Sequence, residues 1–182
     1  MVCSAARDND GRHVGLPERA DIAVLPCGAG DIKRIRGANS HFYYSFANRG
    51  GFVYERLVGT GSLNDMRLYF MSVVADAGWK PGIKILTDLR WAVFPLGFDE
   101  MAQFARDIDD FVQSLNAPSG TLALIAGDDL EFAMGRMYET VSEKSHKEAH
   151  VVRTIEAAVA QLDLDAEVLA TIIATVDSHE PA

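Results

Sequence analysis

Charged side chains follow two predicted strands of this chain. Asp88 and Arg90 come at the end of the predicted strand 83–88, and Asp128 follows the predicted strand 121–126. The carboxyl ends of parallel strands share one edge of a sheet, and ligands favour that edge in open α/β sheets. We therefore take Asp88, Arg90 and Asp128 as candidate ligand-binding residues. The same carboxylates could also serve an enzyme.

Each of these residues has a structural alternative. Short polar side chains commonly satisfy loop backbone, so Asp88 could bond loop amides while Arg90 pairs with it or with a nearby helix. Asp128 or Asp129 precedes a predicted helix and suits its N-cap. A magnesium site of the receiver type would need the acidic pair before the single Asp88, and here the pair comes afterwards. Helix capping is therefore the favoured role of the pair.

Other motifs give little support for catalysis, metal or cofactor. Gly59-x-Gly61 is a fragment of the dinucleotide fingerprint, but Asn64 occupies the third glycine position. His146 and His150 are four residues apart, and two ligands do not make a zinc site. The sequence has no Gly-x-Ser-x-Gly motif, and neither cysteine has a neighbouring His. We expect no catalytic residues, no metal and no cofactor, and hence a protein that is not an enzyme.

Helices and strands alternate through the region that carries the charged candidates. The predicted elements are helix 62–77, strand 83–88, helix 98–115, strand 121–126, helix 129–142, strand 149–153 and helix 154–162. This alternation implies βα units with parallel strands. The short apolar runs of the strands are typical of strands covered on both faces. The fold class is therefore α/β.

An aromatic hairpin precedes these units. Strands 40–46 and 52–58 are rich in strand-forming residues, and Asn48-Arg49-Gly50-Gly51 between them tolerates positive φ. We predict a mixed, mostly parallel sheet in which 52–58 lies beside 83–88, and 40–46 is antiparallel at the edge. Further upstream, residues 21–25 are the one short stretch with strand character.

Helical periodicity predicts which side chains are buried. In helix 62–77, Ser62 suits the N-cap and Asp65 completes a near capping box. The predicted buried stripe of helix 98–115 is Met101, Phe104, Ala105, Ile108, Phe111, Val112 and Leu115. The predicted buried stripe of helix 129–142 is Leu130, Ala133, Met134, Met137, Tyr138 and Val141.

Two of the helices carry apolar side chains on a second face. Leu68 and Met71 point roughly opposite the buried stripe of helix 62–77, and Phe132 does so in helix 129–142. A helix that is apolar on two sides is buried on two sides. Leu68, Met71 and Phe132 are therefore candidate interface residues, covered by the N-terminal extension, a protein partner or a second subunit of a homodimer.

Composition narrows the partners and the compartment. The net charge of −9 repels phosphate backbones and anionic membrane surfaces, so we expect no nucleic acid partner. The apolar stretch 168–176 is too short to span a bilayer. Charged residues interrupt the start after Met1, and Cys3 and Cys27 form no CxxC pair, which favours the cytoplasm. We expect an N-terminal extension at 1–38, a domain at 39–164, and a C-terminal helix and tail at 165–182.

Several local strings, in their order and spacing, resemble the SpoIIAA-like group of bacterial proteins, also described as STAS-like or STAS/Sec14-like. The resemblance covers roughly residues 41–162. It is carried by Gly51-Phe52-Val53-Tyr54-Glu55-Arg56-Leu57-Val58-Gly59, Gly78-Trp79-Lys80-Pro81-Gly82, Leu86-Thr87-Asp88-Leu89-Arg90, Gly127-Asp128-Asp129-Leu130 and Arg136-Met137-Tyr138-Glu139.

The resemblance implies a βα superhelix with a mixed sheet and helices packed to one side. It also implies a regulatory binding module, because STAS domains are mostly of that kind. In anti-sigma-factor antagonists a serine after the strand end is phosphorylated. The matching stretch 91–98 holds no Ser or Thr, so this switch is not expected here. The Sec14 comparison implies binding of an apolar ligand.

Three functional hypotheses follow. The first is a non-enzymatic regulatory or protein-binding module in the bacterial cytoplasm. The second is a carrier of a small apolar or amphipathic ligand, which a large internal cavity would favour. The third is an enzyme that uses carboxylates at the strand edge, which a pair of carboxylates with shifted pKa in one pocket would favour.

Overall fold

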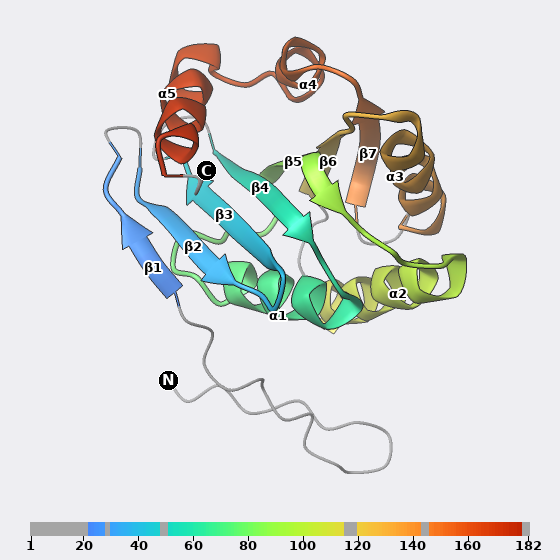
Figure 1. Ribbon diagram of the computed structural model, residues 1–182. Helices are drawn as coiled ribbons and strands as arrows, with labels where there is room; N and C mark the ends of the chain where they lie inside the picture. The colour runs from blue at the N-terminus through green and yellow to red at the C-terminus, as the bar shows by residue number, and fades with distance from the viewer. Residues whose placement is uncertain (1–21, 28–29, 48–50, 115–119, 143–145, 180–182) are drawn as a thin grey trace.

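A seven-stranded mixed sheet forms the centre of the molecule (Figure 1). The computed structural model describes residues 22–27, 30–47, 51–114, 120–142 and 146–179, with the side chains of 146 and 147 left out. The strands follow one another across the sheet in chain order. They are β1 Ile22–Leu25, β2 Ile32–Arg36, β3 Ser40–Phe46, β4 Phe52–Thr60, β5 Lys84–Val93, β6 Gly120–Ile125 and β7 His146–Val152.

The strand pairing confirms most of the predicted topology. β3 and β4 are antiparallel, with Phe42 opposite Leu57, and β4, β5, β6 and β7 are successive parallel neighbours. The predicted turn at 48–50 lies outside the described residues. The placement of 40–46 at the edge was wrong, because β1 and β2 continue the sheet beyond β3.

Strand β2 has no clear signal in the sequence. It contains two apolar residues, Ile32 and Ile35, which are three positions apart. Side chains of a strand alternate between faces, so an odd spacing puts the two on opposite sides. Ile35 packs in the core beside β3 and the helix that follows β4, whereas Ile32 packs in the core on the other side. Neither face therefore shows the repeat that identifies a strand.

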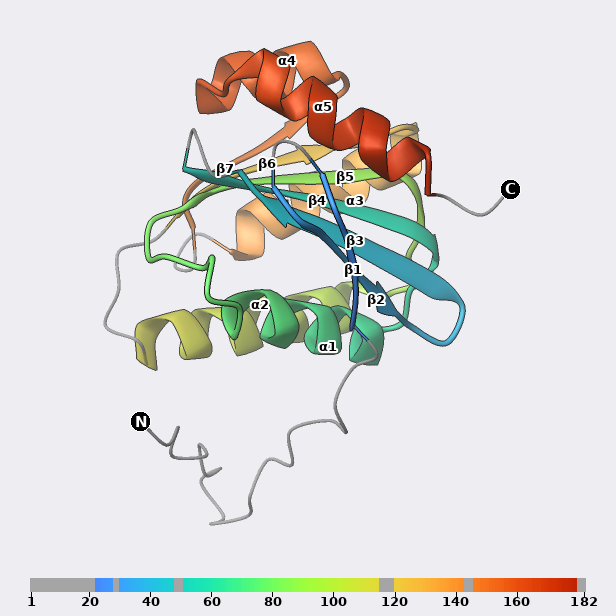
Figure 2. The same ribbon diagram turned by 90° about the vertical axis from the view of Figure 1, so that its left-hand side faces the viewer.

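Helices cover both faces of the sheet, which corrects the one-sided arrangement implied by the family resemblance (Figure 2). One layer holds α1 Leu63–Val74, α2 Phe98–Ser114 and α3 Asp129–Val141, and the opposite layer holds α4 Ile155–Leu162 and α5 Ala166–Asp177. The core of the second layer joins Ala158, Leu162, Leu169, Ile172 and Val176 to Tyr43, Phe52, Tyr54, Leu86, Ala123 and Ile125. Apolar strands with two apolar faces need cover on both.

The helix starts agree with the capping signals. Ser62 caps α1 and forms a full capping box with Asp65, and Asp128 caps α3 and forms one with Glu131. The favoured capping role of Asp128 is thus confirmed.

The buried face of α3 agrees with the predicted one at Met134, Met137, Tyr138 and Val141, which pack in the core, and differs at two positions. Leu130 is 70% exposed and Ala133 is also exposed. The helix instead approaches β7 through Gly135, where a Cβ atom would lie 2.9 Å from the Val151 side chain. Hydrophobic periodicity missed the contact of Gly135 with β7 because glycine has no side chain to contribute to an apolar stripe.

Because helices cover both faces of the sheet, substitutions at two neighbouring residues of α5 should differ in their effect on stability. Ile172 is fully buried, whereas its neighbour Ile173 is half-buried. Ile172→Ala should lower the free energy of unfolding by about 2–5 kcal/mol through lost burial and a cavity. Ile173→Ala should lower it by less than half as much. Urea denaturation measures both, and equal losses would contradict the packing of α5 on the sheet.

Candidate functional site

Asp88 lies inside strand β5 rather than at its end, because β5 continues to Val93. Its side chain has no exposed surface. Arg90 donates from Nε and Nη2 to the two carboxylate oxygens over 2.9 and 2.8 Å, and the Tyr54 hydroxyl donates to Oδ2 over 3.1 Å. The bond to Asp88 raises the pKa of Arg90. The structure therefore brings Asp88 and Arg90 together as a bidentate ion pair.

Arg56 extends this network toward the last helix. Its side chain is fully buried, and its Nε donates to the Tyr54 hydroxyl over 2.8 Å and lies 3.7 Å from Asp88 Oδ2. Its Nη1 forms an ion pair with Asp177 at the end of α5. A buried charge is tolerated when it is paired and hydrogen-bonded, and these contacts meet that requirement. The network thereby ties β4 and β5 to α5.

A bulge in β5 adds an indole ring to the network. In the register of the two strands, Arg56 lies opposite Asp88 and Val58 lies opposite Trp91. β5 therefore holds one residue more than β4 over this stretch. An extra residue changes the face that the following side chain enters. Trp91 consequently lies over the guanidinium carbons of both Arg56 and Arg90, at 4.4 Å each from the ring centroid.

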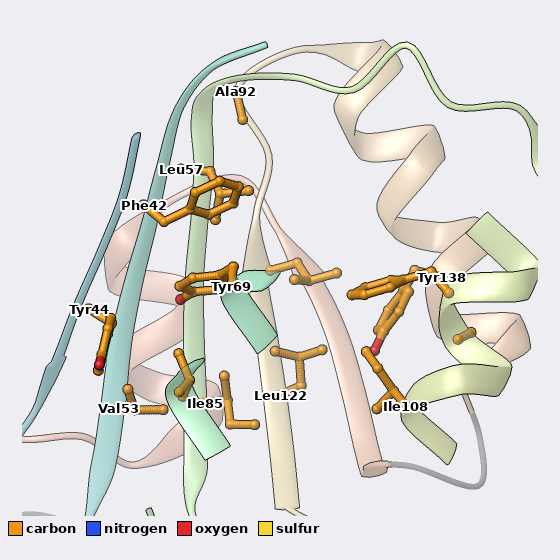
Figure 3. Close-up of a cluster of buried hydrophobic side chains, with 14 of the residues drawn as sticks. Phe42, Tyr44, Val53, Leu57, Tyr69, Ile85, Ala92, Ile108, Leu122 and Tyr138 are labelled. Atoms are coloured by element: carbon orange, nitrogen blue, oxygen red, sulfur yellow. The ribbon is translucent and has the colours of Figure 1, made fainter. Parts of the chain in front are cut away.

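A cavity of about 180 Å³ lies on the opposite face, between the sheet and the layer of α1, α2 and α3. Figure 3 shows Tyr69 of α1 lying against the sheet, with Ile108 and Tyr138 on the helical side across from it. The lining is almost entirely apolar and comes from three strands and three helices. Its members include Leu57, Met66, Phe70, Val73, Ile85, Leu89, Ala92, Met101, Phe104, Leu122, Leu124 and Met134.

Glu55 is the buried carboxyl of this lining. It follows Val53 and precedes Leu57 on the same face of β4, and it is 8% exposed. Thr87 of β5 donates a hydrogen bond to Glu55 Oε2 over 2.7 Å. Among the residues that the structure describes, no Lys, Arg or His forms an ion pair with Glu55. A carboxyl group in an apolar layer with so little compensation is the most unusual feature of the cavity.

Burial raises the pKa of Glu55 from its ordinary value of about 4.5 to about 7, although the nearby hydroxyls of Thr87 and Tyr69 oppose this rise. The pKa of Tyr69 is raised in turn, by burial and then by the charge of Glu55. Removing a carboxylate from water without a counter-ion favours its neutral form. Glu55 is therefore poised to gain or lose a proton near neutral pH.

The rim of the cavity lies at the carboxyl ends of β5 and β6. Asp128 lines it, as do Glu131 and the exposed Val93 and Leu130. Asp128 and Glu131 are engaged in the capping box of α3. Asp88 is fully buried and bonded to Arg90, whereas Asp128 is exposed and accepts a hydrogen bond from the Glu131 amide. The structure therefore joins the first two candidate ligand-binding residues and leaves Asp128 in a separate role.

The three candidate interface residues are all half-buried within the single chain. Leu68 packs against the core of the α1–α3 layer. The Arg153 guanidinium lies over the Phe132 ring, 4.3 Å from its centroid. Most of the predicted N-terminal extension, including residues 1–21, lies outside the described residues, and an interface role for Leu68, Met71 and Phe132 stays a prediction.

Glu55 and Tyr69 were not among the sequence candidates, although a signal for Glu55 was present. The stretch Val53-Tyr54-Glu55-Arg56-Leu57 belongs to a strand predicted to lie inside the sheet. Alternation places Glu55 on the face of Val53 and Leu57, both apolar. A lone carboxyl between two core residues of a central strand marks an unusual environment.

Comparisons with known proteins give one structural match and no family assignment. No family model matches the chain, and no curated protein does. The crystal structure of an uncharacterized protein of the DUF3478 family with a SpoIIAA-like fold, from Shewanella loihica PV-4, matches with a TM-score of 0.41. Identity is 15%, and the alignment covers 80% of this chain and 96% of that one. Its fold carries the same name as the fold that the sequence resemblance implied.

The described part of the chain holds neither a cluster of metal-ligating side chains nor a membrane-spanning helix. Within it, His, Cys, Asp and Glu side chains form no group of three or more that could hold a metal ion. None of the helices described is long and apolar enough to span a membrane.

The two carboxylates bonded to Arg56 should differ in their contribution to stability. Asp88 has no exposed surface, whereas the Asp177 side chain is 55% exposed. Asp88→Asn leaves the buried Arg56 and the half-buried Arg90 short of their shared charge and should lower the free energy of unfolding by about 3–5 kcal/mol. Asp177→Asn should lower it by about 1 kcal/mol or less, because water screens that pair. Chemical denaturation distinguishes them, and an equal effect would contradict the described geometry.

Glu55 should make stability fall as pH rises. The folded state holds the proton more tightly than the unfolded state, so stability decreases between about pH 4.5 and pH 7 and stays reduced above. With about 1.4 kcal/mol per pKa unit, the loss is roughly 3 kcal/mol. The stability of Glu55→Gln relative to the natural protein should therefore rise from pH 5 to pH 8, by an amount of that order. Urea denaturation at both pH values tests this, and a constant difference would contradict it.

Proposed function

We propose that this protein is a non-enzymatic binding module that holds a small, mainly apolar ligand in the cavity between the sheet and α1–α3. The cavity itself is the observation that supports this proposal. It measures about 180 Å³ and is lined by apolar side chains from six elements. Binding sites for small molecules are commonly concave and apolar with a few polar groups, and this cavity has that character.

The volume limits the size of the ligand. A dry cavity of about 150 Å³ lined by aliphatic and aromatic side chains binds benzene. The cavity here is somewhat larger, which suits a single aromatic ring with a short chain. Val93 and Leu130 line the cavity and are exposed to solvent, so a longer ligand would extend outward past them.

The polar groups of the cavity favour binding over catalysis. Among the described residues that line it, none is His, Cys, Lys or Arg, and the buried carboxyl is that of Glu55, whose pKa is raised by burial. The carboxylates of Asp128 and Glu131 at the rim are engaged in helix capping. The enzymatic hypothesis called for a pair of shifted carboxylates, and a single one gives it less support.

A protein-binding module of STAS type is the second candidate. The apolar rim favours it, because Val93 is 59% and Leu130 is 70% exposed and both line the same cavity, and clustered exposed apolar side chains mark interaction surfaces. Native mass spectrometry separates the two candidates, since it reports a retained small molecule and a second subunit independently. A cytoplasmic location is part of both proposals.

Filling the cavity should abolish binding. Propylbenzene is a suitable probe, and at about ten times its dissociation constant it should raise the free energy of unfolding by about 1.4 kcal/mol and the melting temperature by roughly 3 °C. Ala92→Leu adds three carbons to a cavity-lining position of β5, and it should weaken propylbenzene binding at least about tenfold, a loss of roughly 1.4 kcal/mol. Calorimetric titration measures the affinity.

Two further variants control this experiment. Ala133→Leu makes the same change on the exposed surface of α3, outside the cavity lining, and should leave the affinity unchanged. Leu124→Phe fills the cavity from β6 and should act like Ala92→Leu. The proposed function is wrong if the natural protein does not bind propylbenzene, or if the filled variants bind it equally well.

A further inference from the structure

The position of Glu55 narrows the chemistry of the ligand, provided that the cavity binds one as proposed above. We propose that the cavity selects a small ligand with an apolar body and a protonated amine, and that the amine pairs with the carboxylate of Glu55. The ligand class is therefore that of arylalkyl or alkyl amines.

The contacts of Glu55 show what is missing around it. An ionised carboxylate only accepts hydrogen bonds, and its two oxygens offer about four positions for donors. Among the described residues, one donor bonds it with normal geometry, the Thr87 hydroxyl on Oε2. The Tyr69 hydroxyl lies nearby but makes no hydrogen bond of normal geometry within the described residues. A ligand with several N–H donors would complement this group.

Of the charged and titratable groups that surround the cavity, Glu55 is the one inside it that attracts a cation most strongly. From β3, Tyr44 stands opposite Glu55 in the strand register and donates its hydroxyl to Asp76. Tyr69 from α1 and Tyr138 from α3 line the cavity as phenols, and α2 contributes Met101, Phe104 and Ile108. Asp128 and Glu131 lie at the rim, and their negative charge also favours an entering cation.

Other ligand charges fit this environment less well. An anionic head group would place a second negative charge beside Glu55, where the apolar surroundings screen it poorly. A pure hydrocarbon would leave the carboxylate without a partner, so that the group must take up a proton. An amine satisfies the carboxylate and retains the apolar contacts of the remaining lining. Its positive charge also stabilises the ionised form of Glu55 and lowers the pKa of that group.

Three probes of similar size test this proposal by calorimetric titration at about pH 8 and pH 5.5: propylbenzene, 2-phenylethylamine and phenylacetate. The amine of 2-phenylethylamine is an alkylamine like the side-chain amine of Lys, and it stays protonated at both pH values. At pH 8 the amine should bind about tenfold or more tightly than propylbenzene, and phenylacetate should bind more weakly than either. At pH 5.5, where Glu55 carries a proton, the preference for the amine should fall at least about fivefold.

The Glu55→Gln variant removes the charge with little change in shape. It should lose the preference for 2-phenylethylamine over propylbenzene at pH 8, whereas Glu167→Gln, on the exposed surface of α5, should keep it. If Glu55→Gln does not fold, the pH dependence of the natural protein decides. Propylbenzene binding without any preference for the amine, or a preference that is independent of pH or of Glu55, would overturn this inference and leave the proposed function standing. Failure of all three probes would overturn both.

Discussion

The central segments 53–57 of β4 and 85–88 of β5 have no face open to water, because α1–α3 cover one side of the sheet and α4 and α5 cover the other. Side chains alternate along a strand, so each residue of the segment 53–57 must enter one of two apolar layers. Glu55 and Arg56 are adjacent in the chain and consequently point in opposite directions. Each layer therefore receives one buried charge that it has to accommodate.

The two layers accommodate these charges differently. On the α5 side, Arg56 meets Tyr54, Asp88 and Asp177, so the charges and hydrogen bonds compensate one another. That arrangement stabilises the structure and leaves little capacity for a ligand. On the other side, Glu55 has a single hydroxyl donor of normal geometry, and its raised pKa reflects the deficit. The compensated charge is structural, and the incompletely compensated one borders the cavity, which is why the proposals rest on Glu55.

Local signals in the sequence were reliable where their physics is local. Ser62 with Asp65, and the pair Asp128 and Asp129, predict helix starts because a cap needs only a side chain and amides within the next turn. The stripe of α2 was also correct at Met101, Phe104, Ala105 and Ile108, all of them buried. The predicted ligand site was joined only in part, because Asp88 bonds Arg90 whereas Asp128 is engaged in capping α3. Asp88 lies inside β5 rather than at its end, since the strand ends five residues beyond the predicted end.

The sequence by itself determined the α/β class, the parallel strands with 52–58 beside 83–88, and the position of most helices, since periodicity and caps act within a few residues. It did not determine which side of the sheet each helix covers, or that β1 and β2 extend the sheet. Nor did it reveal that Glu55 borders a cavity. Cavities and ion networks join residues far apart in the chain, such as Arg56 and Asp177, and arise from how finished elements pack. Only the tertiary structure could decide which buried charge finds a partner and which is left for a ligand.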